Sequence, residues 1–195
     1  MSLYQDIFDA VVTWTSRPKM VAETNLAISQ AVRKAHRAGM FPRDLAVTTL
    51  SGVPTNAEGL QVIDLSASVP NYRQLAYVKP SGQQRRYTAV GITDLFDQDK
   101  YYRTDVFYIV GANLVIRPAG AADSVDICFY TLPNTSPITA LDSWIAVLHP
   151  DLIVLWAAAT VLALVGEQEI KQRVELLVKP AYTDLIAESL LATGS

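Results

Sequence analysis

The hydrophobic pattern of the chain is centred on residues 151–165, which carry no charged side chain after Asp151 and are apolar on every helical face. A helix that is apolar all round has to be covered by protein or by lipid. About 15 residues make a helix of roughly 22 Å, too short for the ~30 Å hydrocarbon core of a bilayer. Pro150 suits the first helical position, and Gly166 suits the stop. The pattern therefore predicts a central core helix that other helices cover.

Amphipathic helices are predicted on both sides of this run. Residues 3–15 carry two adjacent apolar stripes, which indicate contacts on two sides: Leu3, Ile7, Val11 and Trp14 form one, and Tyr4, Phe8 and Val12 form the other. A second helix is expected to open at Pro18 and to end at Ala38 before Gly39, with the inner positions Val21, Ile28, Val32 and Ala35.

A last helix is predicted after Gly166. Its inner positions have helical spacing and are Ile170, Val174, Leu177, Ala181 and Leu185. Pro180 falls inside this pattern and removes one backbone hydrogen bond, so a kink or break is expected near residues 176–179.

Between the helical pairs the hydrophobic period changes to that of β-strands. Strands are expected at residues 45–50, 60–65 and 74–78, with residues 85–90 as a possible partner strand after the turn at 79–82. Residues 106–110 and 114–117 form a predicted hairpin. Alternation in residues 125–131 predicts a half-buried strand, with Val125, Ile127, Phe129 and Thr131 on one face and Asp126, Cys128 and Tyr130 on the other.

The predicted fold class is α+β: a four-helix bundle built from N- and C-terminal helical pairs, with an inserted antiparallel β-sheet region. A length of 195 residues fits a single domain. Its parts are a helical pair at 1–40, the β region at 44–132, a helical pair at 144–190 and a C-terminal tail at 191–195.

Composition favours an assembled protein over a nucleic-acid-binding one. Half of the residues are hydrophobic and only 18% are charged, which suggests burial against other subunits. The net charge of −3 provides no general basic field for nucleic acid. A lone cysteine, Cys128, fits a reducing compartment. The first residues lack the layout of a signal peptide, and no segment has membrane-spanning length.

The residues able to carry chemistry are few. His36 lies among basic residues, where a solvated side chain is favoured over a catalytic role, and His149 precedes Pro150, where capping or packing is favoured. Asp142 and Ser143 are typical of a helix start before Trp144.

The remaining candidates also have structural interpretations. Cys128 is interpreted as a small packed side chain, and Asp94, Asp97 and Asp99 lack the spacing of a calcium loop. The pairs Tyr101–Tyr102 and Phe107–Tyr108 have no interleaved basic patch, so stacked-base binding is not supported. No histidine and cysteine have metal-ligand spacing. The sequence therefore predicts a protein that is not an enzyme and has no cofactor or metal.

One stretch carries a resemblance to a known family. Residues 108–118, Tyr-Ile-Val-Gly-Ala-Asn-Leu-Val-Ile-Arg-Pro, precede a strand that ends in Phe129-Tyr-Thr-Leu-Pro133, and a loop then leads to Leu148-His-Pro-Asp-Leu152, an Ala-rich helix and a final amphipathic helix. This arrangement resembles the head-to-tail adaptor (connector) proteins of tailed bacteriophages, including the tubular tail adaptors of short-tailed phages. The similarity is best over residues 108–190, whereas the N-terminal helical pair agrees only in position and length.

The resemblance implies a structural virion protein, made in the host cell cytoplasm and located in the neck or tail. It implies a ring, usually of twelve subunits, that lies below the portal protein and above a tail or nozzle protein. Such a ring extends the channel for double-stranded DNA without sequence-specific binding, and it involves no membrane. An acidic pI of about 5.3 suits a channel through which DNA slides.

Two sets of residues are candidate contacts in such an assembly. Closed rings need two different patches on each subunit, and the second stripe of the first helix offers one subunit interface through Tyr4, Phe8 and Val12. The resemblance suggests that the C-terminal end docks on the portal. Candidate portal or tail contacts at this end are Leu191, Ala192, Thr193, Gly194 and Ser195, with simple fraying of the chain end as the alternative. The basic pair Arg85 and Arg86 beside the turn at 80–82 is a further candidate contact, with a merely exposed hairpin as the alternative.

Other functions stay open at this point. A different phage neck or tail-completion protein is the nearest alternative, although such proteins are mainly β-sheet. A small-ligand or peptide-binding protein and a hydrolase using His149 with Asp151 or Ser143 are the alternatives from other classes.

Overall fold

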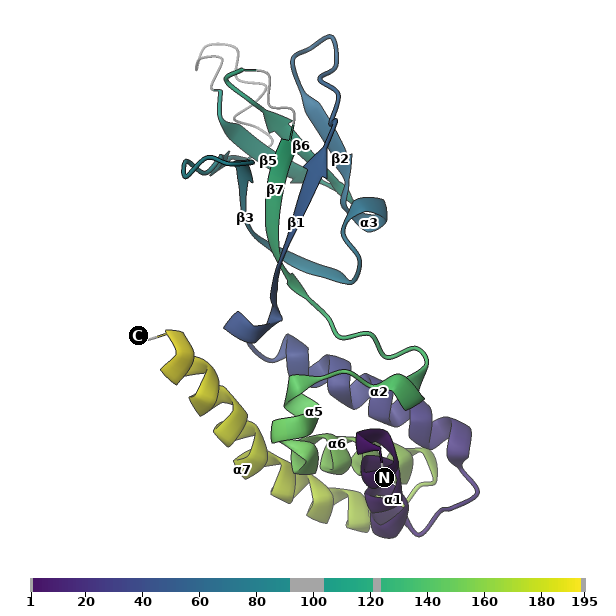
Figure 1. Cartoon of the computed structure of the whole chain (residues 1–195). Coiled ribbons are helices and arrows are strands. Elements are labelled where there is room, and N and C mark those ends of the chain that lie inside the picture. Colours follow the sequence, from purple (N-terminus) through teal and green to yellow (C-terminus); the bar gives the residue numbers. More distant parts are fainter. Residues whose placement is uncertain (1, 92–103, 121–123, 194–195) are drawn as a thin grey trace. The chain divides into compact units, whose positions relative to one another are not determined.

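The computed structural model describes residues 2–91, 104–120 and 124–193, with side chains described up to residue 187 (Figure 1). The chain is of the α+β class and divides into two compact units. The helical unit joins both ends of the chain, Met1–Asp44 and Leu132–Ser195, and the β unit is the intervening segment Leu45–Thr131. No helix in the described part of the chain is long and apolar enough to cross a membrane.

Two helices from the N-terminal part open the helical unit. Helix α1 spans Leu3–Thr15 and is capped by the side chain of Ser2, and helix α2 spans Val21–Arg37. The expectation that Pro18 opens the second helix is wrong, because residues 17–20 form a turn in which the Met20 N–H donates to the Arg17 carbonyl. Val21 is 48% exposed, whereas Ile28, Val32 and Ala35 are buried as predicted.

Helix α6, Pro150–Leu164, is the predicted core helix. Its buried residues lie on all sides of the helix and are Leu152, Ile153, Val154, Leu155, Ala157, Ala158, Ala159, Val161 and Leu162. It packs against α1, α2 and the short helix α5, Trp144–Leu148, as well as against the last helix. Pro150 lies at its start, and Gly166 follows it with φ +81°, a left-handed conformation that glycine adopts without steric cost.

The last helix, α7, runs without interruption over Gln168–Thr193 with Pro180 inside it. Of the kink or break expected near 176–179, the break is therefore wrong. The carbonyl that loses its partner at a helical proline belongs to the residue four positions earlier, here Leu176, whose side chain is 76% exposed. Water can reach this solvent-facing side of the helix and replace the missing bond.

The predicted inner face of α7 is only partly correct. Val174 and Leu185 are fully buried, but Ile170 and Leu177 are 41% and 47% exposed. The helix also continues through Thr193, so Leu191, Ala192 and Thr193 belong to α7 and not to a separate tail. Gly194 and Ser195 lie outside the described residues.

The β unit contains two sheets and a short helix. One sheet has the order β1–β7–β3 and the other has the order β2–β6–β5–β4. The strands are β1 Leu45–Ser51, β2 Gln61–Asp64, β3 Tyr72–Pro80, β4 Thr88–Ala89, β5 Val106–Val110, β6 Asn113–Arg117 and β7 Ser124–Thr131, with α3 at Leu65–Ser68. Both sheets contribute to one buried cluster, which includes Val78, Ile127 and Phe129 from the first and Ile63, Leu114 and Ile116 from the second.

Two strand predictions need correction. Residues 85–90 do not return as a long partner strand, because β4 has only two residues and pairs in parallel with β5. Strand β7 is buried on both faces over most of its length and is not the predicted half-buried strand. The hydroxyl of Thr49 donates to Asp126 (2.8 Å) and Lys79 lies 3.4 Å away, and these partners hold the pKa of the Asp126 carboxyl below its usual value.

We predict that Ala158→Leu is strongly destabilising. Ala158 is fully buried on α6, and overpacking a well-packed core costs typically ~1–3 kcal/mol. Thermal melting should show a lower midpoint, by about 2–4 °C for each kcal/mol in a chain of this size. Ala163→Leu, at an exposed position of the same helix, is the matched control and should melt like the wild type. Equal melting of both variants would contradict the central role of α6.

Candidate functional site

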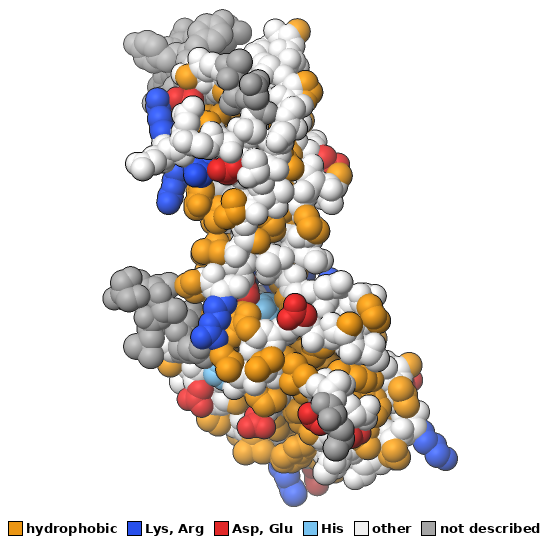
Figure 2. Space-filling view, viewed as in Figure 1, with side chains coloured by type: hydrophobic (Ala, Val, Ile, Leu, Met, Phe, Trp, Pro, Cys, Tyr) orange, Lys and Arg blue, Asp and Glu red, His pale blue; other side chains and the backbone are white. Residues whose placement is uncertain are grey.

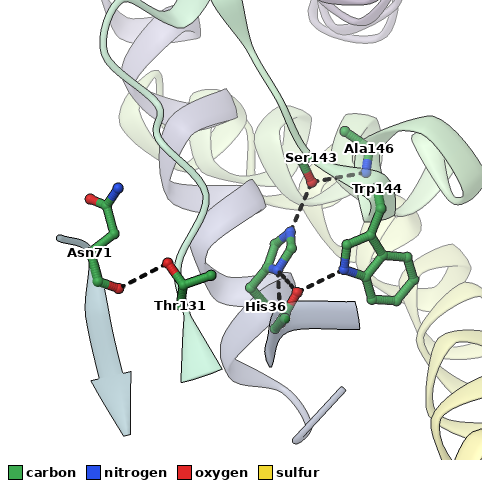
Figure 3. Close-up of polar contacts among 7 residues, drawn as sticks. His36, Asn71, Thr131, Ser143, Trp144 and Ala146 are labelled. Atoms are coloured by element: carbon green, nitrogen blue, oxygen red, sulfur yellow. Dashed lines mark hydrogen bonds and ion pairs between the residues drawn. The ribbon is translucent and has the colours of Figure 1, made fainter. Parts of the chain in front are cut away.

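Four polar or aromatic side chains converge inside the helical unit (Figure 3). His36 comes from the last turn of α2, and Asp44 ends the short 3-10 helix η1, Pro42–Asp44, immediately before the first strand. Ser143 and Trp144 open helix α5 after the chain has returned from the β unit. The end of η1 and the start of α5 are thus tied to α2 within the helical unit.

The contacts among these side chains form a continuous network. His36 Nδ1 lies 2.9 Å from both carboxylate oxygens of Asp44, and Nε2 lies 2.9 Å from the Ser143 hydroxyl. The indole N–H of Trp144 donates to Asp44 over 2.7 Å. The Ser143 oxygen also accepts the backbone N–H of Ala146 (3.1 Å), which makes Ser143 the N-cap of α5.

Aromatic contacts enclose this network. The Trp144 ring meets His36 and Phe41 edge to face, with centroid distances of 5.9 and 5.2 Å. The guanidinium of Arg43 lies 5.1 Å from the centre of the same ring, within the range of a cation–π contact. His36, Asp44 and Ser143 are only 2–3% exposed.

The order serine, histidine, aspartate resembles that of a catalytic triad. With a proton on Nδ1 donated to Asp44, Nε2 can accept the Ser143 hydroxyl proton, as in hydrolases. A nucleophile, however, has to meet a substrate, whereas the Ser143 hydroxyl is buried and already caps a helix. The network fits a structural role, in which a buried carboxylate is retained because donors from two other elements satisfy it.

The expected solvated state of His36 is wrong. Helical spacing would have predicted the burial of His36, because His36 follows the core residues Ile28 and Val32 at intervals of four residues. The charged neighbours Arg33, Lys34 and Arg37 concealed that spacing. Ser143 is confirmed as a helix-start residue. His149 lies between α5 and α6, and its backbone N–H, not its side chain, caps α5 by donating to Ile145.

The other candidates lie in the β unit or outside the described residues. Cys128 is a buried free thiol, as predicted. Arg85 pairs with Asp105 (2.9 Å), and the Arg86 guanidinium lies 4.2 Å from the centre of the Tyr77 ring. Both arginines line a hollow of about 200 Å³. Asp94, Asp97, Asp99, Tyr101 and Tyr102 fall outside the described residues. Within the described part, no group of three His, Cys, Asp or Glu side chains is placed to hold a metal ion.

The stripe Tyr4, Phe8 and Val12 of α1 is half-buried. The Tyr4 hydroxyl donates to Asn25 of α2 (2.7 Å), and Tyr4 and Phe8 pack against the core of the helical unit. Much of the apolar area of this stripe is therefore used within the subunit. More exposed apolar side chains of the helical unit lie elsewhere, for example at Leu26, Val147 and Leu176.

We predict that the network stabilises the helical unit. Asp44→Ala leaves the buried donors of His36 and Trp144 without this acceptor, and each such loss costs about 1–3 kcal/mol. Trp144→Phe keeps an aromatic ring and removes only one donor, so its cost is expected near ~1 kcal/mol. Denaturant unfolding should rank the stabilities as wild type, Trp144→Phe, then Asp44→Ala. A wild-type midpoint for Asp44→Ala would contradict this role.

Comparison with known proteins supplies no family for this chain. No protein-family model matches it, and no curated protein matches it.

Proposed function

We propose that this chain is a structural virion protein, a head-to-tail adaptor subunit that forms a ring between the capsid portal and the tail of a bacteriophage. The ring would extend the DNA channel. Helices α1, α2, α6 and α7 are interpreted as the four-helix frame of such a subunit, with the β unit as its insertion. The resemblance of residues 108–190 to connector proteins supports this interpretation.

The observation that carries the proposal is the exposed apolar surface of the helical unit. Its large side chains with exposures above half include Leu26 (58%), Val147 (59%), Leu164 (61%) and Leu176 (76%). Monomers rarely expose extensive apolar surface, whereas subunits of obligate assemblies bury it against one another. Figure 2 shows hydrophobic side chains over much of the visible face of this unit.

Charge fits a channel protein better than a DNA-gripping one. Proteins that bind duplex DNA neutralise phosphates with clustered lysines and arginines, which makes binding strong and salt-dependent. This chain has 16 basic and 19 acidic residues. We infer that passing DNA is not held by sequence-specific contacts.

The proposed partners are further copies of this chain, the portal above and a tail or nozzle protein below. Arg85, Arg86 and residues 191–195 are proposed portal or tail contacts, and the exposed part of the Tyr4, Phe8 and Val12 stripe is a proposed subunit contact. Another neck or tail-completion protein would share the ring. A small-ligand-binding protein is less well supported, because the hollow in the β unit has only about 200 Å³, below the ~300 Å³ typical of ligand sites, and the larger hollows of the helical unit are grooves wide open to solvent.

Electron micrographs of the purified chain, alone and mixed with the portal of the same phage, test the proposal. We expect closed rings in micrographs of the free protein or of the portal mixture. On the portal, the added density should have the symmetry of a closed ring. Bovine serum albumin mixed with the portal is the control for non-specific density. Particles that stay monomeric in both samples would overturn the proposed function.

We also predict that the buried triad-like network has no hydrolase activity. A fluorophosphonate probe labels activated serines, and the capped, buried Ser143 should not react. Ser143→Ala should therefore give the same background labelling as the wild type, and His149→Ala should leave ring formation intact. Labelling that disappears in Ser143→Ala would reverse the assignment in favour of an enzyme.

A further inference from the structure

Two open grooves flank helix α7 in the helical unit. The first, which we call the cationic groove, has a volume of about 540 Å³ and is lined by Lys34, Arg37, Trp156, Lys179 and Tyr182, among others. The second, the acidic groove, has a volume of about 320 Å³ and is lined by Trp14, Asp151, Leu155, Leu177, Pro180 and Asp184, among others.

The two grooves lie on opposite flanks of α7. A helix turns by about 100° per residue. Lys179 and Tyr182 therefore point to one flank, and Leu177 and Asp184 point to the other. The core-facing residues of α7, such as Leu185, lie between the flanks. The cationic groove is thus the seam where α7 meets α6 and α2, and the acidic groove is the seam where α7 and α6 meet the end of α1.

Both grooves combine apolar surface with charge. In the cationic groove Lys34 Nζ lies 4.4 Å from the centre of the Trp156 ring, and Trp156 lies 5.9 Å from Tyr182, which is 36% exposed. One carboxylate, Glu175, also lines this groove, and it pairs with Lys171 over 3.4 Å. In the acidic groove Trp14 is 45% exposed and Leu177 is 47% exposed.

The charges of the two grooves have opposite signs. Among the described residues that line the acidic groove, the charged ones are Asp151 and Asp184, whereas lysines and an arginine outnumber the single carboxylate of the cationic groove. Two copies that brought like grooves together would oppose like charges. Two copies that brought unlike grooves together would pair opposite charges around apolar contacts.

From this complementarity we infer that the occupant of each groove is a second copy of this chain: the cationic flank of α7 on one subunit packs against the acidic flank on its neighbour. Such a contact is head-to-tail, and repeated with closure it generates a ring. The inference rests on the proposed ring and adds to it the surfaces through which neighbours meet.

Charge reversal tests the pairing. Lys179→Asp and Asp184→Lys should each weaken self-association by roughly tenfold or more, because a repulsive pair replaces an attractive one at a partly desolvated contact. The double variant with both reversals should recover most of the association, since the charges are again opposite between neighbours. Thr183→Asp and Thr183→Lys introduce the same charges at Thr183, on the exposed outer side of α7, and are the matched controls.

Sedimentation velocity of the purified chain gives the association, and rings assembled on the portal are counted in parallel. Circular dichroism melts of all variants exclude unfolding as the cause. A second measurement uses a Cys128→Ser background with Lys179→Cys and Asp184→Cys together and a short bismaleimide. We expect a ladder of cross-linked oligomers from the double-cysteine chain and none from either single-cysteine chain.

The outcomes separate the two proposals. Rings that form equally well from all variants, without a cross-linked ladder, would overturn the pairing of the grooves and leave the ring proposal intact; the grooves would then take another protein. Cross-linked dimers from one single-cysteine chain would indicate a two-fold contact and also overturn the pairing. Absence of rings in every setting, wild type included, would overturn both proposals.

Discussion

The burial of α6 is the constraint on which the helical unit depends. Its apolar residues point in every direction, so no single partner can cover them, and α1, α2, α5 and α7 each contribute a side. The helices α1 and α2 precede the β unit in the chain, and the others follow it. The core can therefore close only when segments more than a hundred residues apart have met, and the entropy of that loop closure grows only slowly with loop length. The long β insertion is compatible with this core for the same reason.

The buried polar network restricts how the elements around α6 can pack. An apolar core alone accepts many similar packings, whereas a buried carboxylate is satisfied only when its donors are in place. Asp44 binds His36 of α2 and Trp144 of α5, and Ser143 caps α5 while it contacts His36. These bonds tie Asp44, the last residue before the β unit, and the start of α5 to α2. In this respect the network selects one packing in addition to its predicted contribution to stability.

The sequence predicts an element correctly where its hydrophobic period and the residues at its two ends indicate the same structure. Helix α1 was predicted with its observed bounds, Pro150 and Gly166 bracket α6, and the hairpin of β5 and β6 follows its alternation. The prediction failed where long-range partners decide the outcome. Burial of His36 depends on Asp44 and Ser143, which no local pattern connects to it, and side chains that cover β7 come from elements distant in the sequence, such as Ile63. The candidate contacts of the proposed ring depend on neighbours that the sequence does not display.

The predicted inner face of α7 is only partly correct because the helix carries two sets of apolar residues. Its apolar residues serve two purposes: Val174 and Leu185 face the core, whereas Leu176 and Leu177 remain exposed. Together the two sets do not lie on one face of the helix. An interpretation with a single apolar face therefore assigns some exposed residues to the core. A helix that had only to cover a core would not need exposed leucines and a tyrosine along its flanks. Such a doubled pattern is typical of a helix that packs once within its subunit and again against a neighbour. In the proposed ring, the opposite charges of its two flanks would pair between neighbouring subunits.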